Sequence, residues 1–549
     1  MRFRPVAALC AVIALTAAAC AGAAAVPEDP AGSGRATLPV KGSKQPSVRL
    51  NGDGSRPRWE LAPGWALDPE LLRGSDRFQQ LARKRPAEPG EPTNVVLISA
   101  DDMTASELRW MPKTRALSGG AGVSFSDSLA PHPLCCPARA MMLTGQFAHN
   151  NGVRTNGWPS GGYYKLDHTN TLPVWMKAAG YETAMVGKYM NEYGMRDIDE
   201  VPPGWDHWRS PARYGNYDYY NYRLNVDGEL REIRGTYQTD YYGEESEQLI
   251  RQMSSDDQPF FLWQSHMAPH TSCPTIATGD ECWGYPTPSL EYSRSFDHAV
   301  PPQRSYPSYN ERDVSDKPAK FASLPPLDRG ERQHLTELFQ RRIESLQSVD
   351  DAVAQTVSAL DEAGELDNTL LIFTSDNGFL LGEHRTGGKN WGYEASLRVP
   401  LLMRGPTVPA GVRRDETVGL VDLAPTIAAV GGANPGLRVD GRNLLPVASG
   451  EKPGWETMLV QAGPRNSQTP GWFFRGVRTD RYTYLAYGTG EVELYDRRRD
   501  PFQLHNVAGD PAYARTQAEL RRRLLALRDC AGAQCRQTFG PVPPPRAAR

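Results

Sequence analysis

Beyond its first residues, this 549-residue sequence lacks a long apolar run, an internal repeat and a large net charge. Without a later apolar run, no membrane-spanning helix is predicted after the leader. The formal net charge of −3 argues against a protein that coats nucleic acid or an anionic membrane by bulk electrostatics, so no nucleic-acid partner is expected. Any bound anion must therefore be held by a local cluster. The length exceeds one compact core and predicts a leader and two domains.

The leader over residues 1–25 has the layout of a secretory signal peptide. Its apolar run from Val6 to Ala19 follows two arginines and is too short to span a bilayer. The stretch Ala17–Ala19 before Cys20 also resembles a bacterial lipobox, in which the cysteine becomes the lipidated first residue. Plain cleavage and lipidation both stay open. The protein is expected to be exported, either secreted or attached to the outer face of a bacterial membrane as a lipoprotein.

Cysteine is scarce, with eight in the chain and two of them in the leader. Export permits disulfides. Two short local pairs are expected to staple loops: Cys273 with Cys282, and Cys530 with Cys535. The adjacent Cys135 and Cys136 stand apart from that scheme and need another explanation.

The remaining chain changes character along its length. Residues 26–92 are rich in proline, glycine and charge, and are expected to form a tether and an irregular lead-in. Over 93–450, short apolar runs alternate with helical stretches at 172–179 and 333–363, which predicts a layered α/β sheet with helices on both faces. The unbroken apolar runs are typical of strands buried on both faces: 95–98, 183–186, 260–263, 370–373 and 399–402.

A second pattern occupies residues 451–540. Residues 473–478 and 482–487 predict hairpin strands on either side of a short turn, and residues 514–527 predict a helix. This segment is therefore expected to be a smaller C-terminal subdomain, an antiparallel sheet with one helix.

Oxygen-bearing side chains follow two of the predicted inner strands. Asp101 and Asp102 come after the first, and Asp376 and Asn377 come after the fourth. Binding sites in open α/β sheets form beyond the carboxyl ends of the strands, and oxygen ligands of this kind suit calcium first and magnesium second. Alternatively, Asp101 caps the next helix and Asp376–Gly378 is a tight turn. Because both acidic segments occur at the ends of buried strands, the metal site is the favoured interpretation.

The segment Cys135–Gly145 combines a cysteine, a proline and an arginine at short spacing. Pro137 suits the first turn of a helix, which places Cys135 at the positive end of that helix and Arg139 about one turn further on. A nucleophile and an anion-binding cation are thereby gathered on one face. The plainer interpretation is a buried or disulfide-bonded cysteine pair before an ordinary helix.

The spacing Cys135-x-Pro137-x-Arg139, followed by Thr144-Gly145, resembles the signature of type I sulfatases. In that family a formylglycine-generating enzyme converts the cysteine to formylglycine, whose hydrated aldehyde is the nucleophile. The resemblance spans roughly Asn94 to Arg404, with a family-like tail to about Cys535. It implies an alkaline-phosphatase-like fold and a sulfuric ester hydrolase.

The same resemblance implies roles for other residues. The implied calcium ligands are Asp101, Asp102, Asp376, Asn377 and the modified Cys135. The implied catalytic set is Cys135, Arg139, Lys188, His270 and Lys389. Its three cations would bind the sulfate oxygens, residue 135 would attack sulfur, and the histidine would protonate or orient the leaving group.

Two departures from the family pattern lie near this set. Many members have Lys-x-His where this chain has Lys188-Tyr189-Met190, so Asn191 or His149 is considered as the substitute for the missing histidine. Gln146 stands where arginine or lysine often follows Thr-Gly.

The segment Gly187–Gly194 resembles the glucosamine-6-sulfatase branch, which implies a sulfated amino sugar as substrate. Its aromatic residues would equally suit a core beneath a lid.

Two other functions compete with this interpretation. A phosphodiesterase or phosphonate monoester hydrolase of the same fold handles esters of similar shape, although a two-zinc phosphatase would want histidine where Asn377 stands. The other is a surface lipoprotein that binds sulfated glycans without hydrolysing them. In such a protein, the loss of catalysis should have left the Cys135–Gly145 motif damaged. The arginine runs at 497–499 and 521–523 could bind a polyanion, but such runs beside acidic residues are usually solvated faces.

Overall fold

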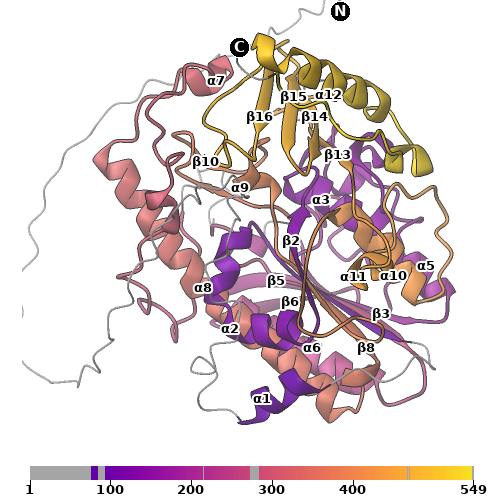
Figure 1. The fold of residues 1–549 in the computed structure, drawn as a ribbon. Helices are drawn as coiled ribbons and strands as arrows, with labels where there is room; N and C mark the ends of the chain where they lie inside the picture. Colours follow the sequence, from indigo (N-terminus) through magenta and orange to yellow (C-terminus); the bar gives the residue numbers. More distant parts are fainter. Residues whose placement is uncertain are drawn as a thin grey trace, which may run out of the picture. The chain divides into compact units, whose positions relative to one another are not determined.

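The computed structural model describes residues 76–84, 93–213, 215–272, 284–466, 468 and 470–546 (Figure 1). The expectations for the signal peptide, for Cys20, for most of the tether and for the pair Cys273 and Cys282 lie outside these ranges. Within them, none of the helices combines the length and apolar character that a bilayer crossing requires.

A mixed ten-stranded sheet forms the centre of the fold, in the order β12-β2-β11-β8-β1-β7-β3-β4-β5-β6. Strands β8, β1, β7, β3 and β4 run parallel, whereas β11 is antiparallel to both of its neighbours. Four of the five predicted apolar runs lie within strands of this sheet, and the fifth, 399–402, overlaps β11 only from Leu401 onward. The strands are β1 (Asn94–Ala100), β2 (Val123–Leu129), β3 (Glu182–Gly187), β4 (His207–Pro211), β5 (Asn221–Val226), β6 (Glu229–Arg234), β7 (Phe260–Ser265), β8 (Thr369–Ser375), β11 (Leu401–Arg404) and β12 (Val412–Gly419).

Helices cover both faces of this sheet, as the alternation of side chains along β1 shows. Val95 and Leu97 belong to one buried cluster, and Val96 and Ile98 to the other. Because successive side chains of a strand point to opposite faces, the sheet separates two cores. The first core contains α3 (Cys135–Thr144), α5 (Leu172–Ala178) and α10 (Leu423–Val430); the second contains α6 (Gln238–Met253) and α8 (Arg329–Glu362).

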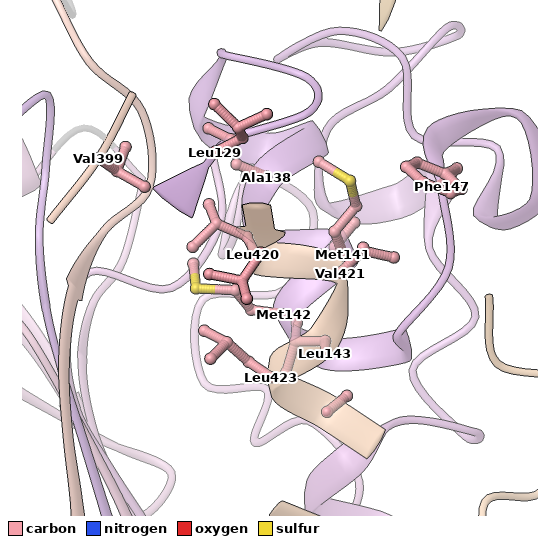
Figure 2. Close-up of a cluster of buried hydrophobic side chains, with 14 of the residues drawn as sticks. Leu129, Ala138, Met141, Met142, Leu143, Phe147, Val399, Leu420, Val421 and Leu423 are labelled. Carbon is pink, nitrogen blue, oxygen red and sulfur yellow. The ribbon is translucent and has the colours of Figure 1, made fainter. Parts of the chain in front are cut away.

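Helix α3 is fixed by packing along its whole length. Figure 2 shows Met141, Met142 and Leu143 packed against Leu420 and Leu423, and all ten residues of the helix are buried. The helix ends at Gly145, whose φ of 63° is the left-handed conformation that favours glycine at this position. The start of α3, where Cys135 lies, is therefore held rigidly relative to the sheet.

Shorter elements complete the described part of the main layer. The helices are α1 (Asp76–Arg83), α2 (Pro112–Thr114), α4 (Ala148–Asn151), α7 (Ala319–Ala322), α9 (Glu394–Leu397) and α11 (Leu445–Ala448). A small ribbon pairs β9 (Leu380–Leu381) with β10 (Gly387–Gly388).

The C-terminal segment forms a second, antiparallel sheet, as predicted. Its order is β13 (Thr457–Ala462), β14 (Phe474–Thr479), β15 (Tyr482–Tyr487) and β16 (Val492–Asp496), with α12 (Ala514–Leu527) packed on it. Buried Arg478 of β14 pairs with Asp127 of β2 and Glu394 of α9, which ties the two sheets together. The predicted disulfide between Cys530 and Cys535 is present. The exact domain boundaries stay a prediction.

Candidate functional site

The four oxygen-bearing residues meet where β1 and β8 end. The Asp102 backbone amide donates to Asp376 Oδ1 at 3.1 Å, and Asn377 Nδ2 donates to Asp102 Oδ1 at 2.7 Å. All four side chains, including Asp101, are buried. Thr104, and not Asp101, lies at the start of the helix that follows, so these acidic residues do not serve as its cap.

Cys135 is the first residue of α3 and lies against these acidic residues. Its Sγ is 3.8 Å from Asp101 Oδ1 and accepts from Lys389 Nζ at 2.8 Å and Lys188 Nζ at 3.9 Å. Burial, and then Asp101, raise the pKa of Cys135 to about 11, which the two lysines only partly oppose. An unmodified thiol here is therefore protonated at neutral pH and is a weak nucleophile. Cys135 and Cys136 are both free, so the disulfide alternative does not hold for them.

Arg139 is directed toward the acidic residues and is completely buried. Nε donates to Asp376 Oδ2 at 2.9 Å and Nη2 donates to Asp101 Oδ2 at 3.1 Å. Nη1 donates to the Lys188 carbonyl at 2.6 Å and to Ser265 Oγ at 2.8 Å. All three nitrogens are thus engaged with protein groups. These contacts place the guanidinium where it positions the carboxylates of Asp101 and Asp376, and its contact with sulfate stays a prediction.

Two lysines balance the negative charge of the cluster. Lys188, at the end of β3, forms a buried ion pair with Asp101, and Lys389 forms one with Asp102. Burial alone would lower the pKa of each lysine, but Asp101 raises that of Lys188 and Asp102 raises that of Lys389. Both lysines are therefore charged. They bring two positive charges to within hydrogen-bonding distance of Cys135 Sγ.

His270 lies beside Asp102, in the loop after β7. Its Nδ1 is 2.8 Å from the Thr271 carbonyl, and its Nε2 is 3.7 Å from Asp102 Oδ2. Because a carbonyl only accepts, Nδ1 carries the proton and Nε2 is left to accept or to be protonated. Burial lowers the pKa of His270 to about 4, against the opposing effect of Asp102.

The candidates for the missing family histidine have different positions. His149 is turned away, with Nε2 2.8 Å from the Cys530 carbonyl and Nδ1 3.4 Å from Gln461 Oε1. Asn191 lies near the site, where its backbone amide donates to Cys136 Sγ at 3.1 Å and its Nδ2 donates to Tyr217 Oη at 2.9 Å. Its side chain is thus next to the start of α3.

Tyr217 is a site residue that the sequence did not reveal. It comes from the short helix Gly215–Tyr217 between β4 and β5. Its ring lies 5.7 Å from Lys188 Nζ and 5.4 Å, centre to centre, from the His270 ring. The tyrosines of that segment carry no spacing that separates this one from its neighbours, so only the fold identifies it.

The cluster has the properties of a site for a hard divalent cation. Ligand atoms from Asp101, Asp102, Cys135 and His270 all lie within 4.8 Å of one another. Asn377 Oδ1 is buried without a hydrogen-bond partner, an arrangement that normally costs free energy. Burial and the nearby Asp101 raise the pKa of Asp376 to about 6. A divalent cation would bind the orphaned oxygen and relieve this repulsion, and the predominance of oxygen donors fits calcium better than zinc.

Comparisons with known proteins agree with this arrangement. A family model described as Sulfatase matches residues 93–433, and one described as N-sulphoglucosamine sulphohydrolase, C-terminal, matches residues 382–530. An arylsulfatase of Volvox carteri is 32% identical over 493 residues, covering 80% of this chain and 75% of the relative. An N-acetylglucosamine-6-sulfatase of Homo sapiens is 31% identical over 492 residues, covering 81% and 86%.

The fold is also found among solved structures. One of them, described as a complex with its substrate D-glucosamine-2-N,6-O-disulfate, superposes with a TM-score of 0.62 at 23% identity. The match covers 80% of this chain and 97% of that chain. The main sheet and the smaller C-terminal sheet are therefore an arrangement that occurs in sulfatases of the alkaline-phosphatase-like fold.

Proposed function

This chain belongs to the sulfatase family, and on that premise we propose that it hydrolyses sulfate monoesters of amino sugars, using formylglycine at residue 135 and calcium. The observation that carries the proposal is the convergence on Cys135 of Asp101 at 3.8 Å and Lys389 at 2.8 Å. A nucleophile at this position lies between an acidic metal-type cluster and two charged lysines. Sulfate ester hydrolysis needs these groups together.

The implied calcium would be held by Asp101, Asp102, Asp376, Asn377 and residue 135, and would supply positive charge beside the sulfate oxygens. Arg139 would keep Asp101 and Asp376 in position through its buried ion pairs. Lys188 and Lys389 would then neutralise the sulfate oxygens, since they stay protonated beside the carboxylates.

Hydrated formylglycine at residue 135 would supply one hydroxyl that attacks sulfur and a second that later releases sulfate. The thiol of Cys135 is a poor substitute, because burial keeps it protonated and it has no second hydroxyl. His270 would orient the leaving oxygen through Nε2, or protonate it when the bound, negatively charged ester raises the pKa of the ring, while the bond from Nδ1 to the Thr271 carbonyl holds the ring.

Relatives support an amino sugar as the substrate. The human relative is named an N-acetylglucosamine-6-sulfatase, and one structural neighbour is described with a glucosamine disulfate. Export by the leader fits such a substrate, and maturation would need a formylglycine-generating enzyme. Lipidation at Cys20 or secretion would follow from how that leader is processed.

Three esters that differ in the group to be cleaved test this proposal. The full chain, produced together with a formylglycine-generating enzyme and supplied with calcium, would be assayed on N-acetylglucosamine 6-sulfate, the 6-phosphate and a phosphonate monoester. We expect the sulfate to have the highest kcat/KM and Cys135→Ala to abolish its hydrolysis. A clear preference for the phosphate or the phosphonate would replace the proposal with the phosphoester alternative. Binding of sulfated sugars without hydrolysis would favour the alternative of a non-catalytic protein that binds sulfated glycans.

A further inference from the structure

Two cations lie over the same pair of aromatic rings, Trp391 and Phe473. Lys320 of α7 has its Nζ 5.1 Å from the Trp391 ring and 5.9 Å from the Phe473 ring. Arg465, in the loop after β13, has its Cζ 4.2 Å and 5.4 Å from the same two rings. Trp391 is only two residues beyond Lys389, so this cluster adjoins the proposed site.

The aromatic floor beneath the cations is rigid. Trp391 is 5% exposed, and its ring makes edge-on contacts with Phe321 at 4.8 Å and Phe473 at 5.7 Å between ring centres. Its backbone amide donates to Ser396 Oγ at 3.2 Å. Cations this close to aromatic rings are attracted by the negative face of the ring.

Neither cation has a carboxylate partner within the ranges that the structure describes. Burial lowers the pKa of Lys320, and Arg465 lowers it further; burial also lowers the pKa of Arg465. Both side chains nevertheless have exposed surface. Two like charges therefore share one aromatic surface, and the repulsion between them is not offset by any described acidic group.

The arginine runs at 497–499 and 521–523, unlike Lys320 and Arg465, include residues with acidic partners. Arg497 pairs with Glu394, Arg498 with Asp480, and Arg522 with Glu519. Their charge is balanced within the protein, and the expectation of solvated faces holds for the exposed Arg498 and Arg522 but not for Arg497, which is buried. Lys320 and Arg465 thus differ from these arginines in lacking a described acidic partner.

We propose that Lys320 and Arg465 form a second anion-binding subsite, which takes a sulfate or carboxylate group of the substrate other than the sulfate that is cleaved. The guanidinium presents paired N–H donors to an oxyanion, and the ammonium adds a point charge. An anion between them offsets their repulsion. The subsite rests on the proposed function and narrows its substrate class to sugars with a second anionic group.

Substrates with one and two anionic groups test the subsite. Arg465→Gln and Lys320→Gln would be assayed on N-acetylglucosamine 6-sulfate, on glucosamine 2-N,6-O-disulfate, and on a disaccharide joining a uronate to the 6-sulfated sugar. We expect each variant to lose about tenfold in kcat/KM on one of the doubly anionic substrates and to retain its rate on the monosulfate. A loss on the disulfate would place the second anionic group on the same sugar, and a loss on the disaccharide would place it on the neighbouring sugar.

Arg498→Gln is the matched control, because it removes an exposed and already paired arginine from the turn just after β16. It should leave all three rates unchanged. An unchanged rate on both doubly anionic substrates, or an equal loss on all three, would overturn the subsite.

A binding measurement separates this inference from the proposed function. In the Cys135→Ala protein, titration calorimetry would compare the affinity of the two doubly anionic sugars with and without Arg465→Gln. Weaker binding of either sugar in the double variant supports the subsite even if no ester is hydrolysed, and unchanged binding of both overturns it. Absence of hydrolysis of every ester by the unaltered protein would instead refute the proposed function.

Discussion

Arg139 Nε lies 2.9 Å from Asp376 Oδ2, in an ion pair with no solvent exposure on either side chain. This bond joins helix α3, which begins at Cys135, to the end of strand β8. The same guanidinium reaches Asp101 at the end of β1. One side chain therefore holds both acidic strand ends against the helix that begins at Cys135, the proposed nucleophile position.

Replacing Arg139 with glutamine should destabilise the protein and weaken calcium binding. Breaking a buried pair leaves uncompensated carboxylates and costs about 3–5 kcal/mol. Denaturant unfolding with and without calcium would measure both effects. Arg478→Gln is the control, since it breaks a comparably buried pair at the other sheet. The control should lose stability but keep its response to calcium; the same calcium response in Arg139→Gln would contradict the positioning role.

Asn377 is expected to contribute directly to calcium binding, because its Oδ1 is buried without a partner. Calcium at about one hundred times its Kd should stabilise the unaltered protein by about 2.7 kcal/mol. Asn377→Ala should show a clearly smaller gain in thermal unfolding experiments.

The matched variant for that experiment is Asn150→Ala. It removes a part-buried amide that donates to Asp440 and to the Cys530 carbonyl, away from the acidic cluster. It should lower stability equally with and without calcium. An undiminished calcium effect in Asn377→Ala would remove this residue from the ligand set.

Four inner strands, β1, β3, β7 and β8, could be predicted because their sequences contain unbroken apolar runs. Strands β1 and β8 have every residue buried, as expected for parallel strands that helices cover on both faces. Strand β12 was not predicted, since its edge position leaves Arg413 and Asp415 at the surface. Strand β6 is similarly polar and exposed. Edge strands carry little of the apolar signal, so only the assembled sheet shows them.

The site was partly predictable for a related reason. Asp101 and Asp376 follow buried parallel strands, whose carboxyl ends meet at one edge of the sheet. The direction of Arg139 could not be inferred, because the spacing places it near Cys135 without saying which side its guanidinium faces. Tyr217 comes from the insertion between β4 and β5, and its place beside Lys188 depends on how that insertion folds back.

His149→Ala should lower stability without slowing the reaction. Its two ring nitrogens lie near the Cys530 carbonyl and Gln461, so the variant loses contacts to the C-terminal segment worth about 1–3 kcal/mol. We expect kcat to stay within about threefold of the unaltered enzyme. A selective fall in kcat with normal stability would restore His149 as the substitute for the missing histidine.

Glu383 should make stability fall as the pH rises. Burial raises its pKa from the usual 4.5 to about 7, and its Oε2 accepts from the Leu381 amide at 2.6 Å. Between these pH values the folded protein keeps a proton that the unfolded chain has released, so the free energy of unfolding decreases with pH. Glu383→Gln should reduce the fall between pH 5 and 8 by about 1–3 kcal/mol.

That change would be followed by urea unfolding at several pH values. Glu229→Gln, at a glutamate with 80% of its side chain exposed, is the control and should leave the pH dependence unaltered. An identical slope in Glu383→Gln and the unaltered protein would show that Glu383 ionises normally in the folded state.

The mass of the peptide that contains Cys135, taken from an active preparation, tests whether this residue becomes formylglycine. We expect the mass of an aldehyde at residue 135, a thiol at the neighbouring Cys136, and sulfatase activity in proportion to the aldehyde fraction. Full sulfatase activity in a preparation where residue 135 is entirely an intact thiol would contradict it.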